Sequence, residues 1–247
     1  MALTDNVSPY YKLDGDSNDD STTSYNGTDT SITYSDANGV INNGAGFNGS
    51  SSKILLPAGV KQSGSFSIAL WIKIDILGNY YITSDWDGGA RNYLIATDSS
   101  GKLNFLSGNS STSQDPTLTN DTTLSIDTWY HVVFVRDGAK LTIYLNASAD
   151  GTVTGSYTGG ATSNVTYLGT SVRSSSSDFL DGAMDEVGFW SRALTSTEIT
   201  TLYNGGNGLQ YPFVTTDIKS INGLAKASIK SRNSLAIGSI KSINGLE

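Results

Sequence analysis

The 247-residue chain contains no cysteine, one histidine and four prolines. The lack of cysteine excludes disulfides, a thiolate nucleophile and a Cys-ligated zinc site, and it leaves the redox compartment open. Glutamate is also scarce, because Glu186, Glu198 and Glu247 are the only three.

Long apolar runs are missing as well. No stretch of about 18 apolar residues occurs, and a membrane-spanning helix needs roughly that length. The first eleven residues, MALTDNVSPYY, lack the charged and apolar regions of a secretory signal. We therefore expect no membrane insertion and no general secretory signal.

Basic residues are few and unevenly placed within a net charge of -8. Residues 1–213 carry 10 Lys and Arg against 21 Asp and Glu, whereas residues 214–247 carry 5 against 2. Binding to nucleic acid depends on Lys and Arg that neutralise phosphates. The acidic part of the chain is thus not expected to bind nucleic acid, and the two parts should meet different partners.

What the chain has in quantity is glycine, with 27 residues, and tyrosine, with 13. This composition is typical of short strands joined by turns. Residues 66–74 alternate strictly between Phe, Ile or Leu and other residues, which predicts a strand with one face in a core. Asp137-Gly138 between two apolar runs predicts a hairpin. Counted together, about a dozen strands are expected, which is typical of an all-β sandwich.

A short helix is predicted near the end of this part of the chain. Thr195 and Glu198 have the spacing of a capping box, and Gly205 is expected to supply the left-handed residue that ends the helix. Before the helix, Asp181-Gly182 reads as a turn and Met184–Trp190 as a strand.

Three sequence segments carry a resemblance to a known family. They are YYKLDG at residues 10–15, GFNGSSSKILLP at residues 46–57, and DFLDGAMDEVGFWSRALTSTEI at residues 178–199. Together they resemble the laminin-G-like branch of the concanavalin A-like lectin and glucanase domains. The glucanases of this family carry a Glu-x-Asp-x-Glu array on one strand, which this sequence lacks, so the resemblance implies a domain without their paired catalytic carboxylates. The resemblance covers roughly residues 8–206 and implies a jelly-roll β-sandwich with one short helix, here assigned to residues 1–213. His131, in a strand similar to one of that family, is interpreted as a structural residue.

A carbohydrate site is predicted on one loop. Saccharides are held by an aromatic face and planar polar side chains, and the loop between two predicted strands offers both. Its candidate residues are Asp85, Trp86, Asp87, Arg91, Asn92 and Tyr93. The alternative is that Trp86 belongs to the core.

A structural Ca²⁺ ion is the second prediction. Its candidate ligands are Asp14 or Asp16, in the acidic loop 14–29, and Asp185, which on the alternation shares an inward face with Val187 and Phe189. An inward carboxylate needs a partner, and oxygen ligands suit calcium; domains of the resembling family often hold such an ion. The alternatives are a solvated loop and a carboxylate bonded to the backbone.

Residues 214–247 contain an eleven-residue repeat that begins at Ile218, Ile229 and Ile240. An eleven-residue period suits a right-handed coiled coil, but the Asn-Gly dipeptides and the Ser and Ile content favour short extended pieces with turns. The repeats resemble those at the ends of bacteriophage virion proteins. We interpret this segment as a basic attachment or oligomerisation tail that docks on copies of itself or on other virion proteins. Its expected contact residues are Ile218, Ile221, Leu224, Ile229, Leu235, Ile240, Ile243 and Leu246.

The sequence as a whole predicts a non-catalytic carbohydrate-binding appendage on the surface of a phage virion, a fibre or decoration protein that contacts a host surface glycan or polysaccharide. The alternative is a purely structural decoration or assembly protein that binds no sugar.

Overall fold

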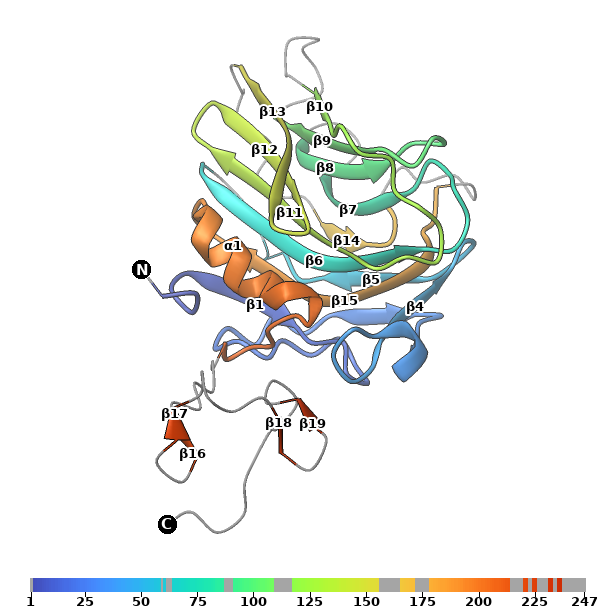
Figure 1. Cartoon of the computed structure of the whole chain (residues 1–247). Coiled ribbons are helices and arrows are strands. Elements are labelled where there is room, and N and C mark those ends of the chain that lie inside the picture. Colours follow the sequence, from blue (N-terminus) through green and yellow to red (C-terminus); the bar gives the residue numbers. More distant parts are fainter. Residues whose placement is uncertain are drawn as a thin grey trace. The chain divides into compact units, whose positions relative to one another are not determined.

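The computed structural model shows two compact units, Met1–Phe213 and Val214–Glu247 (Figure 1). In the first unit, here called the body, it describes residues 2–58, 60, 64–86, 91–108, 117–155, 165–171 and 178–213; Trp86 and Arg91 are described by their backbone alone. In the second unit it describes the backbone of four two-residue strands.

The body is built from two antiparallel sheets. The eight-stranded sheet runs β13-β12-β11-β6-β15-β4-β3, with β1 paired to β15. Its strands are β1 (Val7–Tyr11), β3 (Thr33–Ser35), β4 (Gly44–Asn48), β6 (Phe66–Ile74), β11 (Tyr130–Asp137), β12 (Lys140–Leu145), β13 (Ser148–Thr154) and β15 (Asp181–Trp190).

The second sheet has seven strands in the order β10-β9-β8-β7-β14-β5-β2. They are β2 (Thr28–Thr30), β5 (Lys53–Leu56), β7 (Tyr81–Trp86), β8 (Arg91–Thr97), β9 (Leu103–Ser107), β10 (Thr117–Thr119) and β14 (Thr166–Leu168). Two sheets packed face to face with one helix, α1 (Ser196–Tyr203), confirm the predicted jelly-roll sandwich. Two short 3₁₀ turns, Asp36–Asn38 and Asn204–Gly206, complete the elements of the body.

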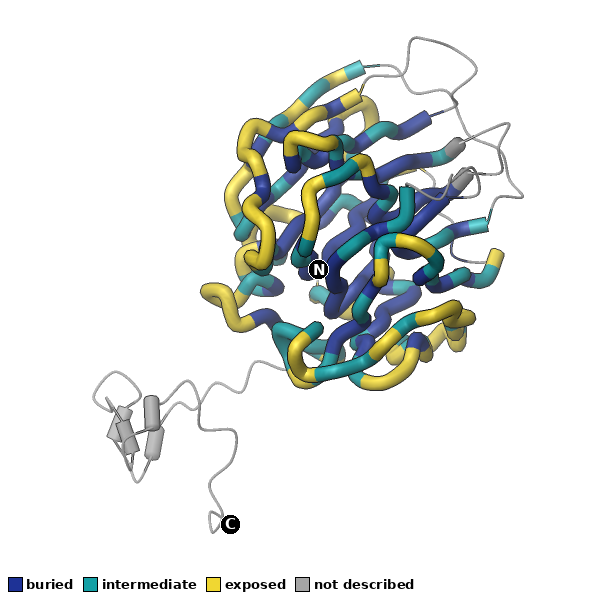
Figure 2. Tube along the Cα trace, turned by 90° about the vertical axis from the view of Figure 1, so that its right-hand side faces the viewer, coloured by how far each residue is buried: buried dark blue, intermediate teal, exposed yellow. Residues whose placement is uncertain are grey.

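The main core lies between the sheets, where Figure 2 shows the buried strands. One face of β6 enters it with Phe66, Ile68, Leu70, Ile72 and Ile74, the five residues that the alternation assigns to the core. Residues that point inward at every second position fill the space between two sheets. The alternation therefore predicted the inner face of β6 correctly.

The other face of β6 is buried too, which the alternation did not predict. Helix α1 lies across the outer face of the eight-stranded sheet (Figure 1) and packs Ile199 and Leu202 into a second apolar cluster with Ala69 and Trp190. Trp71, on the same outer face, stacks on Tyr203 with 5.8 Å between ring centroids. A strand that is buried on both faces need not carry polar side chains on either of them. The sequence of β6 alone does not show that a helix covers its second face.

Helix α1 begins with the predicted capping box. The hydroxyl of Thr195 accepts a hydrogen bond from the Glu198 amide, and the Glu198 carboxylate accepts one from the Thr195 amide. The left-handed residue that caps the C-terminus is Asn204, with φ of 49°, and Gly205 follows with φ of 62°. The predicted stop was one residue late, because asparagine also adopts this conformation.

A β-bulge in β15 changes which side chains face the core. The register slips between Asp185 and Gly188 relative to β6, and Glu186 adopts a positive φ of 52°. An extra residue in one strand inverts the alternation beyond it. Met184 and Val187 both enter the main core, so the predicted common inward face of Asp185 and Val187 is wrong. Strand β15 also begins at Asp181, where a turn was expected.

The second unit contains two small antiparallel hairpins. Ser220–Ile221 pairs with Leu224–Ala225, and Ser231–Arg232 pairs with Leu235–Ala236. These are short extended pieces of the kind expected for the repeats. Ile218, Ile229, Ile240, Ile243 and Leu246 lie outside the described residues, and Ile221, Leu224 and Leu235 are described by their backbone alone.

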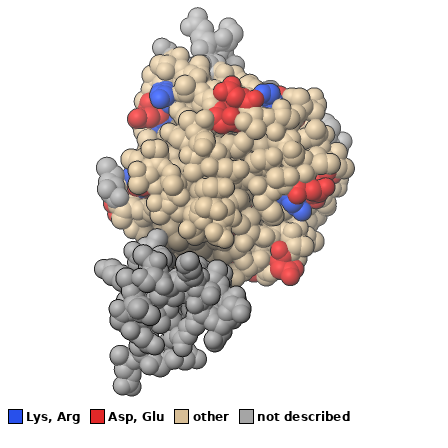
Figure 3. Space-filling view, in the orientation of Figure 1, with Lys and Arg blue, Asp and Glu red and all other residues tan. Residues whose placement is uncertain are grey.

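Charged side chains are sparse on the face of the body seen in Figure 3, where small groups of acidic and basic residues adjoin within a wide uncharged surface. This face presents no broad basic patch of the kind that nucleic-acid binding requires. None of the helices in the described part of the chain has the length and apolar character needed to cross a membrane.

Candidate functional site

The predicted carbohydrate loop connects β7 and β8, and three of its six residues have described side chains. Asp85, Asn92 and Tyr93 are placed, whereas Asp87 and the side chains of Trp86 and Arg91 lie outside the described residues. Asp85 pairs with Tyr93 across the two strands. The loop itself therefore stays a prediction.

Tyr93 is a core residue. Its side chain has no exposed surface, and its ring lies 5.6 Å from that of Phe66. Burial, and then the charge of Asp85, raise the pKa of its hydroxyl well above the usual range. Asp85 is also fully buried, and the amide of Asn92 donates a 2.5 Å hydrogen bond to it. Neither Tyr93 nor Asp85 reaches the surface, so neither can contact a saccharide from outside.

A cleft of about 230 Å³ opens at the opposite end of the same two strands. Tyr81 and Ala96 pair at this end, whereas Trp86 and Arg91 pair at the loop end. Eight residues line the cleft: Asn79, Tyr80, Tyr81, Ala96, Thr97, Asp98, Asn104 and Asp178. Two tyrosines beside amide and carboxylate groups are the kind of lining that small polar ligands need.

Backbone and hydroxyl contacts hold the wall of the cleft. The Thr97 hydroxyl accepts a hydrogen bond from the Tyr80 amide and donates one to the Gly78 carbonyl, over 3.2 and 2.8 Å. The Tyr81 amide donates to the Asp178 carbonyl. Since Thr97 is buried and both its bonds reach the 78–80 segment, the backbone of this segment is held in place without a ligand.

The floor of the cleft is the outer face of the seven-stranded sheet. Tyr81 lies opposite Ala96, Ala96 opposite Asn104, and Asn104 opposite Thr119. Their chain neighbours Ile95, Leu103 and Phe105 point into the main core, so these four residues point outward. A row of partly exposed side chains thus crosses β7, β8, β9 and β10.

Asp98 closes the cleft at the start of the turn between β8 and β9. One carboxylate oxygen, Oδ1, accepts hydrogen bonds from the Ser100 amide, the Ser100 hydroxyl and the Lys102 amide, over 2.8, 2.5 and 3.0 Å. Partial burial works against the charge, but these bonds and one from Asn104 outweigh it and lower the pKa of Asp98. The carboxylate is therefore ionised and acts only as an acceptor.

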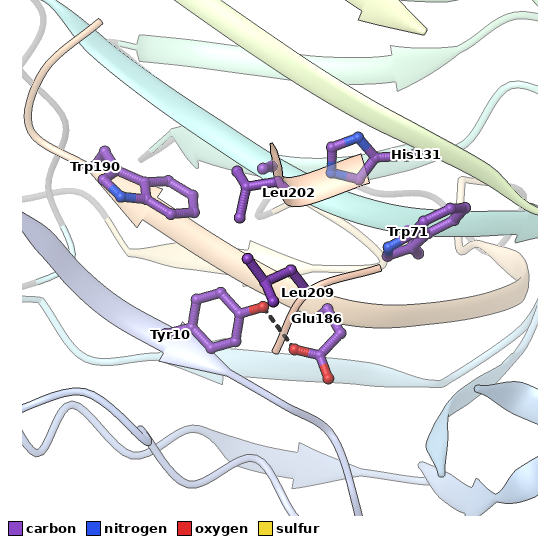
Figure 4. Close-up of a pocket in the computed structure, with 8 residues that line it drawn as sticks. Tyr10, Trp71, His131, Glu186, Trp190, Leu202 and Leu209 are labelled. Atoms are coloured by element: carbon purple, nitrogen blue, oxygen red, sulfur yellow. Dashed lines mark hydrogen bonds between the residues drawn. The ribbon is translucent and has the colours of Figure 1, made fainter. Parts of the chain in front are cut away.

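A second polar cluster lies under α1, on the other sheet. The Tyr10 hydroxyl donates a 2.5 Å hydrogen bond to the Glu186 carboxylate, which is drawn in Figure 4. The side-chain amide of Gln210 donates hydrogen bonds to both Glu186 and Asp14, over 2.8 and 2.9 Å. The adjoining cavity holds about 10 Å³, room for a single water. This cluster joins the chain ends of the body and has no space for an organic ligand.

His131 lines the same cavity and is a structural residue in the body. It is 3% exposed, and its ring lies 5.2 Å from that of Trp71 (Figure 4). Burial lowers the pKa of His131 to about 3, so the ring is neutral. Trp71 and Trp190 pack under α1, and Trp129 lies half-buried just before β11.

The predicted calcium ligands are brought together only in part. Asp14 and Asp185 lie near enough for the charge of Asp14 to raise the pKa of Asp185. Asp185 accepts hydrogen bonds at Oδ2 from the Val40 and Ile41 amides, while its buried Oδ1 has no partner. Both carboxylates fit as oxygen ligands, and the unpaired Oδ1 is an atom that a cation would satisfy. Among the described residues, however, no three acidic, histidine or cysteine side chains gather as a metal cluster.

Asp16 is placed differently from the other two. Both its carboxylate oxygens accept hydrogen bonds from Asn18, from the backbone amide and from the side chain. Burial and the neighbouring Asp29 raise the pKa of the Tyr34 hydroxyl, and the charge of Asp16 adds to that rise. If calcium binds, Asp14 and Asp185 would hold it, because Asp14 is the loop candidate whose charge raises the pKa of Asp185.

The pKa values of the neighbouring acids reflect their burial. Desolvation raises the pKa of Asp185 to about 7, against the backbone amides that favour its charge. Desolvation and the charge of Asp185 raise the pKa of Glu186 to about 8. Two acids side by side in a low-dielectric site cannot both ionise easily.

Sequence reasoning missed the cleft because none of its residues stands out alone. Asp98, Ser100 and Lys102 do form a turn signal between two short strands. The row that includes Tyr81 and Asn104 depends on the pairing of strands, which the alternation within a single strand does not reveal.

Solved structures with the same fold include binding domains. One is domain 4 of AbnA, a GH43 extracellular arabinanase from Geobacillus stearothermophilus in complex with arabinotriose, with 24% identity and a TM-score of 0.63 over 79% of this chain and 97% of that domain. The binding domain of Paraclostridial Mosquitocidal Protein 1 has 17% identity and a TM-score of 0.66 over 83% of this chain. The receptor binding domain of botulinum neurotoxin type G has 14% identity and a TM-score of 0.60 over 81%. The chain spans about half of these two toxin domains, 53% and 51%.

At these identities the structures share the fold. By sequence, residues 48–200 match the model of a family described as the concanavalin A-like lectin/glucanases superfamily, of the laminin G type. A comparison with curated proteins found no match.

Proposed function

Since the chain belongs to the concanavalin A-like lectin/glucanases superfamily, we propose that its body is a non-catalytic carbohydrate-binding domain and that the cleft beside Tyr81 is its sugar site. The observation that carries the proposal is the composition of the cleft. An aromatic ring beside amide and carboxylate groups matches the apolar face and the hydroxyl rim of a sugar ring. The arabinotriose complex of a structurally similar domain supports the same class of ligand.

The absence of catalysis is part of the proposal. A glycosidase needs a carboxylic acid whose pKa is raised so that it can protonate the leaving group. Asp98 has a lowered pKa. Glu198 is bonded to Arg192. Glu186 does have a raised pKa, but it is buried against Tyr10 and Gln210 beside a cavity with room for a single water. The described glutamates are thus engaged in holding the fold.

We propose further that residues 214–247 attach this domain to the surface of a phage virion, as part of a fibre or decoration protein that contacts host glycans. The support is the eleven-residue repeat with Lys219, Lys230 and Lys241 at matching positions. A basic segment suits docking against an acidic protein surface. The partners would be other virion proteins or copies of this chain.

The cleft is tested by replacing its exposed ring. Tyr81→Ala should reduce binding to glycans on an oligosaccharide array, or to host cells, by at least about tenfold, because aromatic contacts contribute on the order of 1 kcal/mol beyond the apolar area that they bury. Tyr167→Ala is the matched control, since Tyr167 lies on β14 of the same sheet outside the cleft. It should bind normally.

A second variant separates the cleft from the loop predicted by sequence. Trp86→Ala should leave glycan binding intact if the cleft is the site, and should abolish it with little change in thermal stability if the loop is the site. A wild-type chain that binds neither saccharides nor cells would contradict carbohydrate binding altogether. That outcome favours the alternative, a structural decoration or assembly protein.

A further inference from the structure

Asp98 and Asn104 place one hydrogen-bond acceptor and one donor next to each other in the cleft. Both residues line it, and Asn104 lies near enough to Asp98 to add, after Ser100 and Lys102, to the lowering of its pKa. The three turn contacts from Ser100 and Lys102 all fall on Oδ1 of Asp98. Its other oxygen, Oδ2, is therefore the one left to accept further bonds.

Thr119 fixes the orientation of Asn104. Its hydroxyl donates a 2.7 Å hydrogen bond to the carbonyl oxygen, Oδ1, of Asn104. An asparagine amide has two nearly equivalent orientations, and its hydrogen-bond partners decide between them. With the carbonyl oxygen held by Thr119, the NH₂ group of Asn104 is the end that faces Asp98 and the cleft.

A carboxylate oxygen can only accept, and an amide NH₂ group can only donate. Two adjacent hydroxyl groups of a sugar supply the matching set, because one donates its proton to the carboxylate while its neighbour accepts from the amide. We infer that the cleft selects saccharides that present two adjacent unsubstituted hydroxyl groups, one of which donates a hydrogen bond to Asp98 while the other accepts one from Asn104. The inference rests on the proposed carbohydrate binding and names the chemical class that the site takes.

Substituted sugars should bind poorly. O-methylation or O-acetylation removes the proton that Asp98 needs and leaves a partly desolvated carboxylate without its partner. A site built to bond a hydroxyl rejects an analogue that lacks it strongly, because its own polar group stays unpaired. We expect at least about a tenfold loss of affinity for the substituted sugar, the size of a charged hydrogen bond.

The test uses the full chain and a panel of neutral trisaccharides of glucose, xylose, arabinose, mannose and galactose, each unsubstituted and O-methylated, with affinity measured by calorimetry. Wild type should prefer at least one unsubstituted sugar by about tenfold or more. Asp98→Asn should abolish this preference. Asparagine keeps an Oδ1 atom that can accept the hydrogen bonds of the turn, and it is common in such turns. The variant should therefore keep the fold.

Thr119→Val and Thr119→Ser test the positioning of Asn104. The valine variant loses the hydroxyl and should weaken the preference, and the serine variant should restore it. Thr117→Val is the matched control, because Thr117 lies on the same face of β10 but pairs with Leu106. It should behave like wild type.

The outcomes separate this inference from the proposed function. If wild type binds a substituted sugar as well as its unsubstituted form, or if Asp98→Asn keeps the preference, the diol inference is wrong while carbohydrate binding stands. If no trisaccharide or glycan binds, both are wrong.

Discussion

Asp185 is a buried carboxyl group in which one oxygen is satisfied and the other is not. The Val40 and Ile41 amides bond Oδ2, and Oδ1 has no hydrogen-bond partner. Leaving a buried polar atom unsatisfied typically costs about 1 to 3 kcal/mol. A bound cation would remove that cost, which is why this atom makes the calcium hypothesis testable.

We predict that chelation of calcium lowers the melting temperature of the protein and that added calcium restores it, because an ion that binds the folded state alone stabilises it. Scanning calorimetry with EDTA, and then with excess Ca²⁺, checks this. Asp14→Asn should remove the calcium response, whereas Asp16→Asn should keep it. A melting temperature that moves with neither chelator nor calcium means that no site exists.

Single residues were the least predictable from sequence. Tyr93 and Tyr81 both lie in short predicted strands, yet Tyr93 is fully buried and Tyr81 is partly exposed in the cleft. The difference arises because a bulge between Tyr81 and Thr83 and the pairing with β8 set which ring faces the core. Neither the bulge nor the pairing is encoded in the types of these residues.

At the scale of an element, α1 is held by one charged contact. Arg192 donates two hydrogen bonds to the Glu198 carboxylate, 2.9 and 2.7 Å long, and Glu198 also completes the capping box. Partial burial opposes the charge of Glu198, but the Arg192 and Thr195 bonds outweigh it and lower its pKa from 4.5 to about 2. A carboxylate whose pKa is lower in the folded state stabilises that state above its unfolded pKa.

We predict that Glu198→Gln lowers the free energy of unfolding by about 2 kcal/mol at neutral pH, the size of a charged hydrogen bond. That should lower the melting temperature by about 4 to 8 °C for a domain of this size. The stabilisation is lost as pH falls from 4.5 to about 2, so the two proteins should converge across this window in acid. Thermal melts at several pH values check this.

Asp127→Asn is the control, because Asp127 is an exposed turn residue whose backbone conformation asparagine also adopts. It should melt like wild type at neutral pH. A constant gap between wild type and Glu198→Gln from pH 7 to pH 2 would contradict the linkage.

Elements were predicted well where one physical signal dominated. The capping box of α1 and the inner face of β6 depend on local spacing and were confirmed. The bulge in β15 was not predictable, because the residues Asp185 and Glu186 look like any acidic pair, and the positive φ at Glu186 is imposed by the contacts of the pair with other strands. Local rules fail where tertiary contacts decide.

For the whole molecule, the change of composition at residue 214 matches the division into two units. The body has its own core between two sheets, which is enough for it to fold alone. We predict that deleting residues 214–247, the proposed attachment segment, leaves a soluble, folded, monomeric body that no longer joins the proposed particle. Light scattering and incorporation into particles check this, and normal incorporation of the truncated protein would contradict it.

The last residue of the body, Phe213, stacks on Trp190 with 6.0 Å between ring centroids. Trp190 belongs to β15, which is hydrogen-bonded along its length to β6, β4 and β1. If residues 214–247 attach the body as proposed, we expect tension on them to act through Phe213 on a central strand, whose ladder hydrogen bonds share the load, and not on an edge strand. The cleft lies on the outer face of the other sheet, so we expect such tension to leave the proposed sugar site undistorted.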